Sequence, residues 1–340
     1  MTIRLDRRRG GGAWRWLAGA LFGTRRRVSR RAVRPRRSGI EALETRLALA
    51  VTPSLVLDIN TVPVGSDPAG FTLVGDVAYF AATDGEHGRE LWRTDGTPDG
   101  TALVADIVPG SLSSNPQQLT AVGTTLFFVA PHGSDQALWK TDGTAGGTVV
   151  VKDFWGAPEP DAAPRDLVAL GSTLFFVADT VADDGNSHGV ELWKSDGTTD
   201  GTKMVADLLP GLDPWGLGPM SSRPTNLVPW GERLYFVASS SDDTHGGDVL
   251  FSTDGTAEGT VVVSTINDAW SGFPRDLVLA GDRLFFSAWS PLGLRGLWAS
   301  DGTDAGTALV AEVGASENAV RRSGEHTSEL QSRQYLVCRL

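Results

Sequence analysis

The segment ELWKSDGTTDGT, residues 191–202, is one of five related twelve-residue segments in this 340-residue chain. The other copies begin at Glu90, Ala137, Val249 and Gly296. Measured at the aromatic residue that follows the leucine, successive copies are 47, 54, 58 and 47 residues apart. Periods of this length are typical of β-propeller blades and similar repeat arrays, so the segment predicts a repeated architecture.

Each repeat contains four short segments with the composition of β-strands. The second segment, for example TLFFVA, has successive apolar residues and must be covered on both faces, so the sheets must stack on one another. The first segment of each repeat holds a leucine, namely Leu73, Leu119, Leu167, Leu227 or Leu277. The pattern predicts an all-β fold, a β-propeller of four-stranded antiparallel blades. A linear solenoid of sheets is the alternative.

Residues 54–60, SLVLDIN, resemble the fourth strand of a repeat but precede the first complete repeat. The chain therefore holds six fourth strands and five sets of the other three. We expect this extra strand to complete the last blade of a larger ring, of which five complete repeats are present here.

The Asp-Gly-Thr segment predicts a self-satisfied turn rather than a ligand site. Its aspartate can accept bonds from the backbone N–H groups that follow, its two glycines admit positive φ, and its threonine hydroxyls can bond free backbone groups. The aromatic residue before it can pack between blades. The turn aspartates are Asp95, Asp142, Asp196, Asp254 and Asp301.

These repeats resemble those of bacterial proteins named for the phrase Glu-Leu-Trp-x-x-Asp-Gly-Thr. The resemblance covers residues 54–313 and departs from the phrase at Ala137, Val249, Phe251 and Gly296. It implies an extracellular or surface repeat region of uncharacterised activity, and it supplies no catalytic residue.

Residues 1–50 contain 14 arginines and no lysine. A nucleic-acid-binding arm and a targeting segment both fit this composition, and the change of composition after Ala50 favours targeting. Residues 40–50, IEALETRLALA, also resemble the Leu-Glu-x-Arg-x-Leu export motif of large secreted bacterial proteins. We therefore expect residues 1–50 to direct export, residues 51–313 to form the repeat domain, and the protein to be secreted or to lie at the cell surface.

The C-terminal tail, residues 314–340, includes RSGEHTSELQS at residues 322–332. This segment resembles a translated sequencing-library adapter with one mismatch, at Gly324. We interpret residues 321–340 as artefactual, the alternative being a polar terminus, and assign no role to Cys338, the single cysteine.

Charge limits the classes of partner. Residues 51–320 hold 12 lysines and arginines against 36 aspartates and glutamates. An acidic surface repels phosphate backbones and anionic lipids, so we expect no nucleic-acid partner. No uninterrupted apolar run approaches 18 residues, so we expect no membrane insertion of the mature chain.

Two sets of residues are candidates for binding, and both lie in connections that vary between repeats. Tryptophans between repeats can stack on sugars or pack over a blade edge; these are Trp155, Trp215 and Trp270. Acidic pairs are either a weak Ca²⁺ site or a solvated turn; these are Asp84 with Glu86, Asp183 with Asp184, and Asp242 with Asp243. We expect no cofactor, with Ca²⁺ as the alternative.

No catalytic motif in the expected structural context is present, and we assign no catalytic residue. The histidines that precede glycine in four repeats are expected to be loop residues; they are His87, His132, His188 and His245. We expect a non-enzymatic binding or structural module with a glycan or protein ligand on its variable loops. The alternative is an extracellular polysaccharide hydrolase or lyase on a propeller scaffold.

Overall fold

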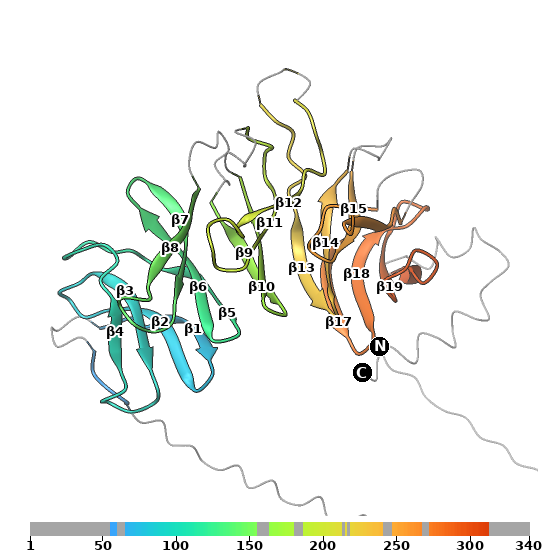
Figure 1. The fold of residues 1–340 in the computed structure, drawn as a ribbon. Coiled ribbons are helices and arrows are strands. Elements are labelled where there is room, and N and C mark those ends of the chain that lie inside the picture. The colour runs from blue at the N-terminus through green and yellow to red at the C-terminus, as the bar shows by residue number, and fades with distance from the viewer. Residues whose placement is uncertain are drawn as a thin grey trace, which may run out of the picture. The chain divides into compact units, whose positions relative to one another are not determined.

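The computed structural model describes residues 55–59, 65–154, 163–179, 186–212, 215, 218–240, 247–266 and 272–312. Within these ranges the chain forms twenty β-strands and no helix (Figure 1). The strands form five four-stranded antiparallel sheets, each a meander whose strand order follows the sequence. The prediction of an all-β fold with four-stranded blades is confirmed.

The five sheets are numbered as blades 1 to 5 in chain order. Blade 1 consists of β1 (Ala69–Val74), β2 (Val77–Thr83), β3 (Arg89–Thr94) and β4 (Ala102–Ala105). Blade 2 consists of β5 (Gln117–Val122), β6 (Thr125–His132), β7 (Asp135–Thr141) and β8 (Val149–Phe154). Blade 3 consists of β9 (Arg165–Leu170), β10 (Thr173–Ala178), β11 (Glu191–Ser195) and β12 (Lys203–Ala206). Blade 4 consists of β13 (Thr225–Trp230), β14 (Arg233–Ser239), β15 (Asp248–Thr253) and β16 (Val261–Ser264). Blade 5 consists of β17 (Arg275–Ala280), β18 (Arg283–Trp289), β19 (Arg295–Ser300) and β20 (Ala308–Glu312).

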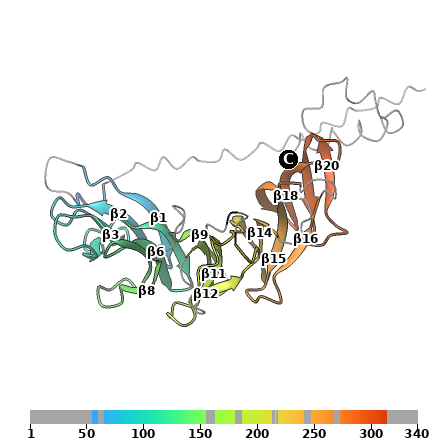
Figure 2. The same cartoon turned by 90° about the horizontal axis from the view of Figure 1, so that it is seen from above.

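Successive blades pack on one another as in a β-propeller (Figure 2). Their first strands contact in chain order, β1 with β5, β5 with β9, β9 with β13 and β13 with β17. No packing of comparable extent joins blade 5 to blade 1 among the described residues, so the ring is not closed within them.

The second strand of each blade contacts both neighbouring blades. In β10, Leu174, Phe176 and Ala178 pack with residues of blade 2, whereas Phe175 packs with residues of blade 4. Because alternate residues of a strand point to opposite faces, a strand between two blades must be apolar at every position. This explains the TLFFVA pattern.

An aromatic side chain of one blade packs against the Asp-Gly turn of the next. A Cβ atom on Gly255 would lie 3.0 Å from the Phe175 ring, so this ring occupies the space that a side chain would need. The same contact joins Tyr79 to Gly143, Phe127 to Gly197 and Tyr235 to Gly302. Each glycine is therefore needed for close packing as well as for its positive φ of 89° to 91°.

At the two ends of the series this contact lacks one partner. Gly96 of blade 1 has the same φ of 89°, but nothing lies within 4 Å of its Cβ position. Phe285 of blade 5, which corresponds to Phe175, is only half-buried, and so is Leu297, whose counterpart Leu192 is buried.

The Asp-Gly-Thr hairpins satisfy their own backbone. The Asp196 carboxylate accepts bonds from the Thr198 backbone N–H at 2.8 Å and from the Thr198 hydroxyl at 2.7 Å. The Thr198 hydroxyl oxygen accepts a bond from the Gly201 N–H at 2.9 Å. The same bonds recur in the hairpins of Asp95, Asp142, Asp254 and Asp301.

Two details of the sequence prediction are wrong. The second glycine of the hairpin does not have a positive φ; Gly201 is required because a Cβ there would lie 2.0 Å from the Asp196 carboxylate. Leu73 lies in the first strand as predicted, but it is not the counterpart of Leu119 in blade 2. That counterpart is Phe71, because Thr72 pairs with Tyr79 as Thr120 pairs with Phe127.

Residues 55–59, expected to be a fourth strand, are not paired in any of the five sheets. Ile59 instead packs against Phe80, Ala82 and Trp92 on the face of blade 1 that points away from blade 2. No three-stranded partner for this segment lies within the described residues.

The contact between blades predicts a difference between two glycine substitutions. Gly96→Ala should cost about 1–2 kcal/mol of unfolding free energy, because alanine is strained at positive φ. Gly255→Ala should cost about 1–3 kcal/mol more, since its methyl group also meets the Phe175 ring. Urea denaturation followed by tryptophan fluorescence measures both. Equal destabilisation by the two substitutions would show that the aromatic contact contributes nothing.

Candidate functional site

The connections of each blade lie at the two opposite ends of its strands, which are called its two edges here, and they differ between these ends. In a meander, the turns after the first and third strands emerge at one edge, and the connections after the second and fourth strands emerge at the other. The first edge carries the five nearly identical hairpins. The second, here called the variable edge, carries connections that differ in length and sequence from blade to blade. Variable loops on a rigid scaffold are where binding is usually found.

Buried glutamates fix two of the linkers on the variable edge. Glu191, at the start of β11, is fully buried and accepts bonds from the Ser222 N–H at 2.8 Å, the Ser222 hydroxyl and the Leu208 N–H. Glu90 of blade 1 makes the same bonds, to the N–H and hydroxyl of Ser114 and to the N–H of Ile107. Each carboxylate thus joins both ends of a linker to the third strand.

The glutamate and its serine partner occur together within this chain. Blade 2 has Ala137 in place of the glutamate and Ala162 in place of the serine, and blade 4 has Val249 and Gly272. A buried carboxylate is costly without hydrogen-bond partners, which explains why the two residues are present or absent as a pair. The sequence analysis did not predict that the glutamate of the ELW phrase holds the linker between two blades in place.

Burial dominates the electrostatics of these two groups. It raises the pKa of Glu191 to about 8, although the bonds from Ser222 and Leu208 act in the opposite direction and nearby Asp207 adds to the increase. Burial also raises the pKa of Glu90. Both groups are sealed from solvent, so they hold structure rather than face a ligand.

Histidine–aspartate pairs lie at the variable edge of three blades. His188 Nδ1 lies 2.7 Å from Asp207, and His132 Nδ1 lies 2.7 Å from Asp153. In blade 1, His87 Nδ1 lies 2.6 Å from Asp84, and this bond raises the pKa of His87. His87 and His188 are loop residues, as the sequence predicts, whereas His132 is the last residue of β6 and that expectation is wrong for it. His245 lies outside the described residues.

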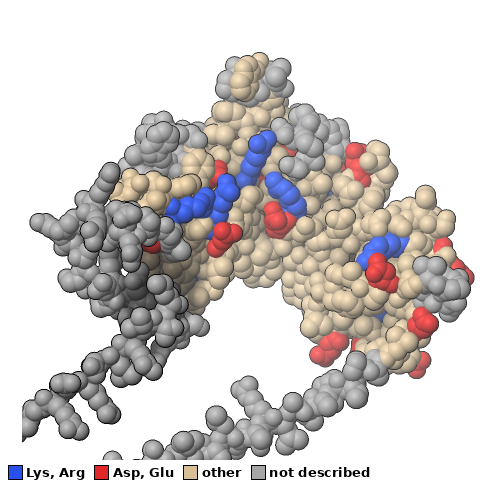
Figure 3. All heavy atoms as spheres, turned by 180° about the vertical axis from the view of Figure 1, so that it is seen from behind, with Lys and Arg blue, Asp and Glu red and all other residues tan. Residues whose placement is uncertain are grey.

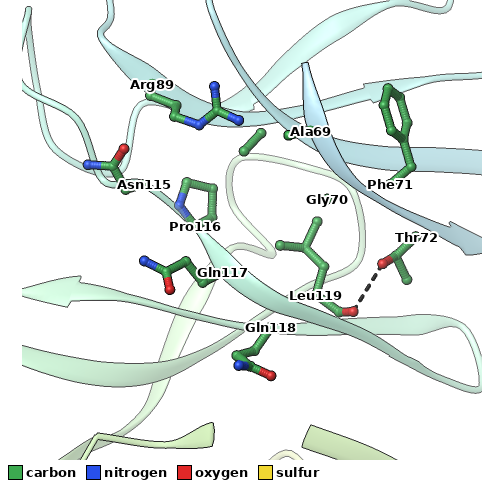
Figure 4. Close-up of a pocket in the computed structure, with 11 residues that line it drawn as sticks. Ala69, Gly70, Phe71, Thr72, Arg89, Asn115, Pro116, Gln117, Gln118 and Leu119 are labelled. Atoms are coloured by element: carbon green, nitrogen blue, oxygen red, sulfur yellow. Dashed lines mark hydrogen bonds between the residues drawn. The ribbon is translucent and has the colours of Figure 1, made fainter. Parts of the chain in front are cut away.

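An open-sided cavity of about 630 Å³ lies between β1 and β5 near the variable edge (Figure 4). Its polar lining comes from Arg89 and from three carboxamide side chains, those of Asn115, Gln117 and Gln118. Its apolar lining includes Leu119, whereas the Phe71 ring turns to the other face of blade 1 and stacks on Phe80. The volume falls in the range of about 300–1,000 Å³ that is usual for small-molecule sites.

Small residues on β1 leave room for this cavity. Blade 1 has Ala69 and Gly70 after its proline, where the other blades carry larger pairs: Gln117–Gln118, Arg165–Asp166, Thr225–Asn226 and Arg275–Asp276. The second residue of each pair has a positive φ. Gly70 adopts this conformation without strain and also leaves out a side chain that would fill the cavity. The proline that precedes each pair makes this exception visible in the sequence, and the strand register confirms the correspondence.

The structure places one of the predicted tryptophans. Trp215 lies on the linker between blades 3 and 4 and is 79% exposed. Trp289, which the sequence did not single out, is 39% exposed at the end of β18, with the Arg295 guanidinium 5.2 Å from its ring centre. Trp155, Trp270 and four of the proposed Ca²⁺ residues, Asp183, Asp184, Asp242 and Asp243, lie outside the described residues.

Charges of both signs are mixed on the face shown in Figure 3. Among the described residues of this face, the few lysines and arginines have aspartates or glutamates close by. Lys194 donates a hydrogen bond to the Gly255 carbonyl of the next blade at 2.6 Å. In the described part of the chain, no group of three or more histidine, cysteine, aspartate or glutamate side chains could hold a metal ion, and no helix could span a membrane.

No protein-family model and no curated protein matches this chain. Among solved structures, it is similar to a prolyl endopeptidase (TM-score 0.44, 18% identity, 76% of this chain and 37% of that chain). It is also similar to the β-propeller domain of the Trilobed protease from Pyrococcus furiosus, described as having an open velcro topology (TM-score 0.40, 11% identity, 73% and 72%). A third is TolB from Acinetobacter baumannii (TM-score 0.35, 16% identity, 70% and 54%). The chain thus spans less than half the length of the prolyl endopeptidase.

The buried Glu191 predicts a pH-dependent stability. Its pKa is higher in the folded protein than in the unfolded chain, so the folded state binds more protons between about pH 4.5 and 8 and loses stability as pH rises through that window. Glu191→Gln should reduce this slope, which is at most about 1.4 kcal/mol per pH unit. Urea denaturation at several pH values measures it. Glu258→Gln, at an exposed hairpin position, is the control, and equal slopes in all three proteins would contradict the assignment.

Proposed function

We propose that the repeat domain is a non-enzymatic binding or structural module that takes a glycan or protein ligand at its variable edge. The observation that carries this proposal is the contrast between the two edges. One edge repeats the same self-bonded hairpin five times, while the other presents different loops, the exposed Trp215 and the Arg89 cavity. We further propose that the protein acts outside the cell, as its export-like N-terminal segment indicates.

The placement of the buried acids supports a scaffold rather than a catalyst. A general acid or base must reach the proton that it transfers. Glu90 and Glu191 have raised pKa values of the kind found in active sites, but both are fully buried and bonded to backbone amides of the linkers. Their geometry holds loops in place.

The alternative, a polysaccharide hydrolase or lyase, depends on carboxylates of the variable edge that lie outside the described residues. Turnover of a polysaccharide panel, lost when Asp183, Asp184, Asp242 and Asp243 are all changed to Asn, would favour this alternative. Binding without turnover favours the module.

The proposal predicts that an exposed aromatic residue contributes to binding. On glycan and peptide arrays probed with the full chain, Trp215→Ala should weaken the bound signal several-fold, because a stacking surface is lost. Leu212→Ala is the matched control, since Leu212 lies on the same linker and is 65% exposed but has no aromatic ring. Absence of any glycan or protein ligand would overturn the proposal, and equal loss in both variants would remove Trp215 from the site.

A further inference from the structure

The face of blade 5 that points away from blade 4, here called end face 5, has the residues of a contact between blades but is left open by the described residues. Val278 on this face is 58% exposed, and Phe285, Leu297 and Val310 are only half-buried. The counterparts of the last three are buried in the contact with the next blade in every other blade. They are Tyr79, Leu91 and Val104 of blade 1, Phe127, Leu138 and Val151 of blade 2, Phe175, Leu192 and Val205 of blade 3, and Tyr235, Leu250 and Val263 of blade 4.

One polar residue lies within end face 5, and its hydrogen bonds are internal. Ser287 stands where blades 2, 3 and 4 have valine. Its hydroxyl donates to the Asp276 carboxylate at 3.4 Å and accepts a bond from Arg295 Nη1 at 3.1 Å. Covering a hydroxyl that already has partners costs far less than covering one that depends on water. Ser287 therefore does not prevent this face from being buried.

The face of blade 1 that points away from blade 2, here called end face 1, presents the other half of the same contact. Phe71 and Leu73 lie on it and are 61% and 67% exposed. Nothing described lies within 4 Å of the Cβ position of Gly96, whereas Gly143, Gly197, Gly255 and Gly302 each meet a ring of the preceding blade. End face 1 thus has the hairpin glycine without a ring, and end face 5 has a ring, Phe285, with no described glycine against it.

Residues 55–59 leave room for another blade on end face 1. Ile59 holds the place on this face that Ile107 holds in the contact between blades 1 and 2. Strand β20 ends at Glu312, one position before this place in the repeat, so β20 and Ile59 do not compete for it. Residues 55–57 are exposed and pair with none of the five sheets, so they can give way to a neighbouring fourth strand without loss of sheet hydrogen bonds.

We propose that copies of this chain associate head to tail, with end face 5 of one copy on end face 1 of another and Phe285 against the Gly96 hairpin. A second copy is the occupant because it carries the matching half of a contact that the chain already makes four times. Open apolar faces of this kind are typical of association sites. Because the two faces are unlike, each dimer keeps one of each, and further copies can add unless a ring closes.

Two substitutions block one end face each at low risk to folding. Val278→Glu places a charge on end face 5, and Leu73→Glu places one on end face 1; both replace exposed side chains. An unpaired carboxylate is costly to bury, so each should raise the dissociation constant about tenfold or more. The matched controls are Leu292→Glu and Leu112→Glu, which add the same charge on loops of the variable edge, at leucines that are 74% and 67% exposed.

The experiment is sedimentation velocity of the full chain over a range of concentrations. We expect the unmodified chain and both controls to form dimers and larger species as concentration rises, and Val278→Glu and Leu73→Glu each to remain monomeric. An equimolar mixture of these two variants should form a heterodimer that grows no further, because one variant still offers end face 1 and the other still offers end face 5. The heterodimer would also show that both variants are folded.

Three results would overturn the inference. An unmodified chain that stays monomeric at every concentration would show that its end faces do not join copies. A dimer formed by Val278→Glu alone or by Leu73→Glu alone would show that like faces pair, or that association uses another surface. Monomeric variants with unchanged melting temperatures that form no heterodimer when mixed would exclude the contact between end face 5 and end face 1.

Discussion

The fold depends on one contact, an aromatic ring of one blade packed against a glycine in the hairpin of the next. The glycine is needed twice, for its left-handed backbone and for the space that Phe175 or its counterparts occupy. The same hairpin satisfies its own polar groups through the turn aspartate, so it can be buried against a neighbour at little cost. The twelve-residue segment therefore forms both the hairpin at one edge of its blade and part of the interface with the preceding blade.

Much of the fold was predictable because the same sequence repeat occurs five times. The period, the four strands of each repeat and the doubly apolar second strand all follow from spacing and composition, and the structure agrees. The errors concern features that spacing does not reveal. The role of Gly201 depends on a carboxylate that folds back over it. The match of Phe71 to Leu119 was missed although each lies three residues after a proline, Pro68 or Pro116, and the strand register shows it.

The candidate site was less predictable, because it arises from exceptions to the repeat. The sequence identified the variable edge and Trp215, but it did not show that Ala69 and Gly70 leave space between two blades or that Arg89 reaches that space. The glutamate of the ELW phrase was treated as part of the signature. Its function as a linker anchor becomes evident only when Ser114 and Ser222 are seen to meet it in the folded chain.

The aromatic–glycine contact also has a direction. Every blade offers a ring on one face and a glycine on the other, so the two faces are unlike and each can join only its opposite. Such a contact fixes the direction in which blades stack and keeps each pair in register, yet it does not determine how many blades complete the ring. In this protein the number of blades must be set by the angle between neighbouring sheets, a property of side-chain volumes across the whole interface and not of the repeated phrase.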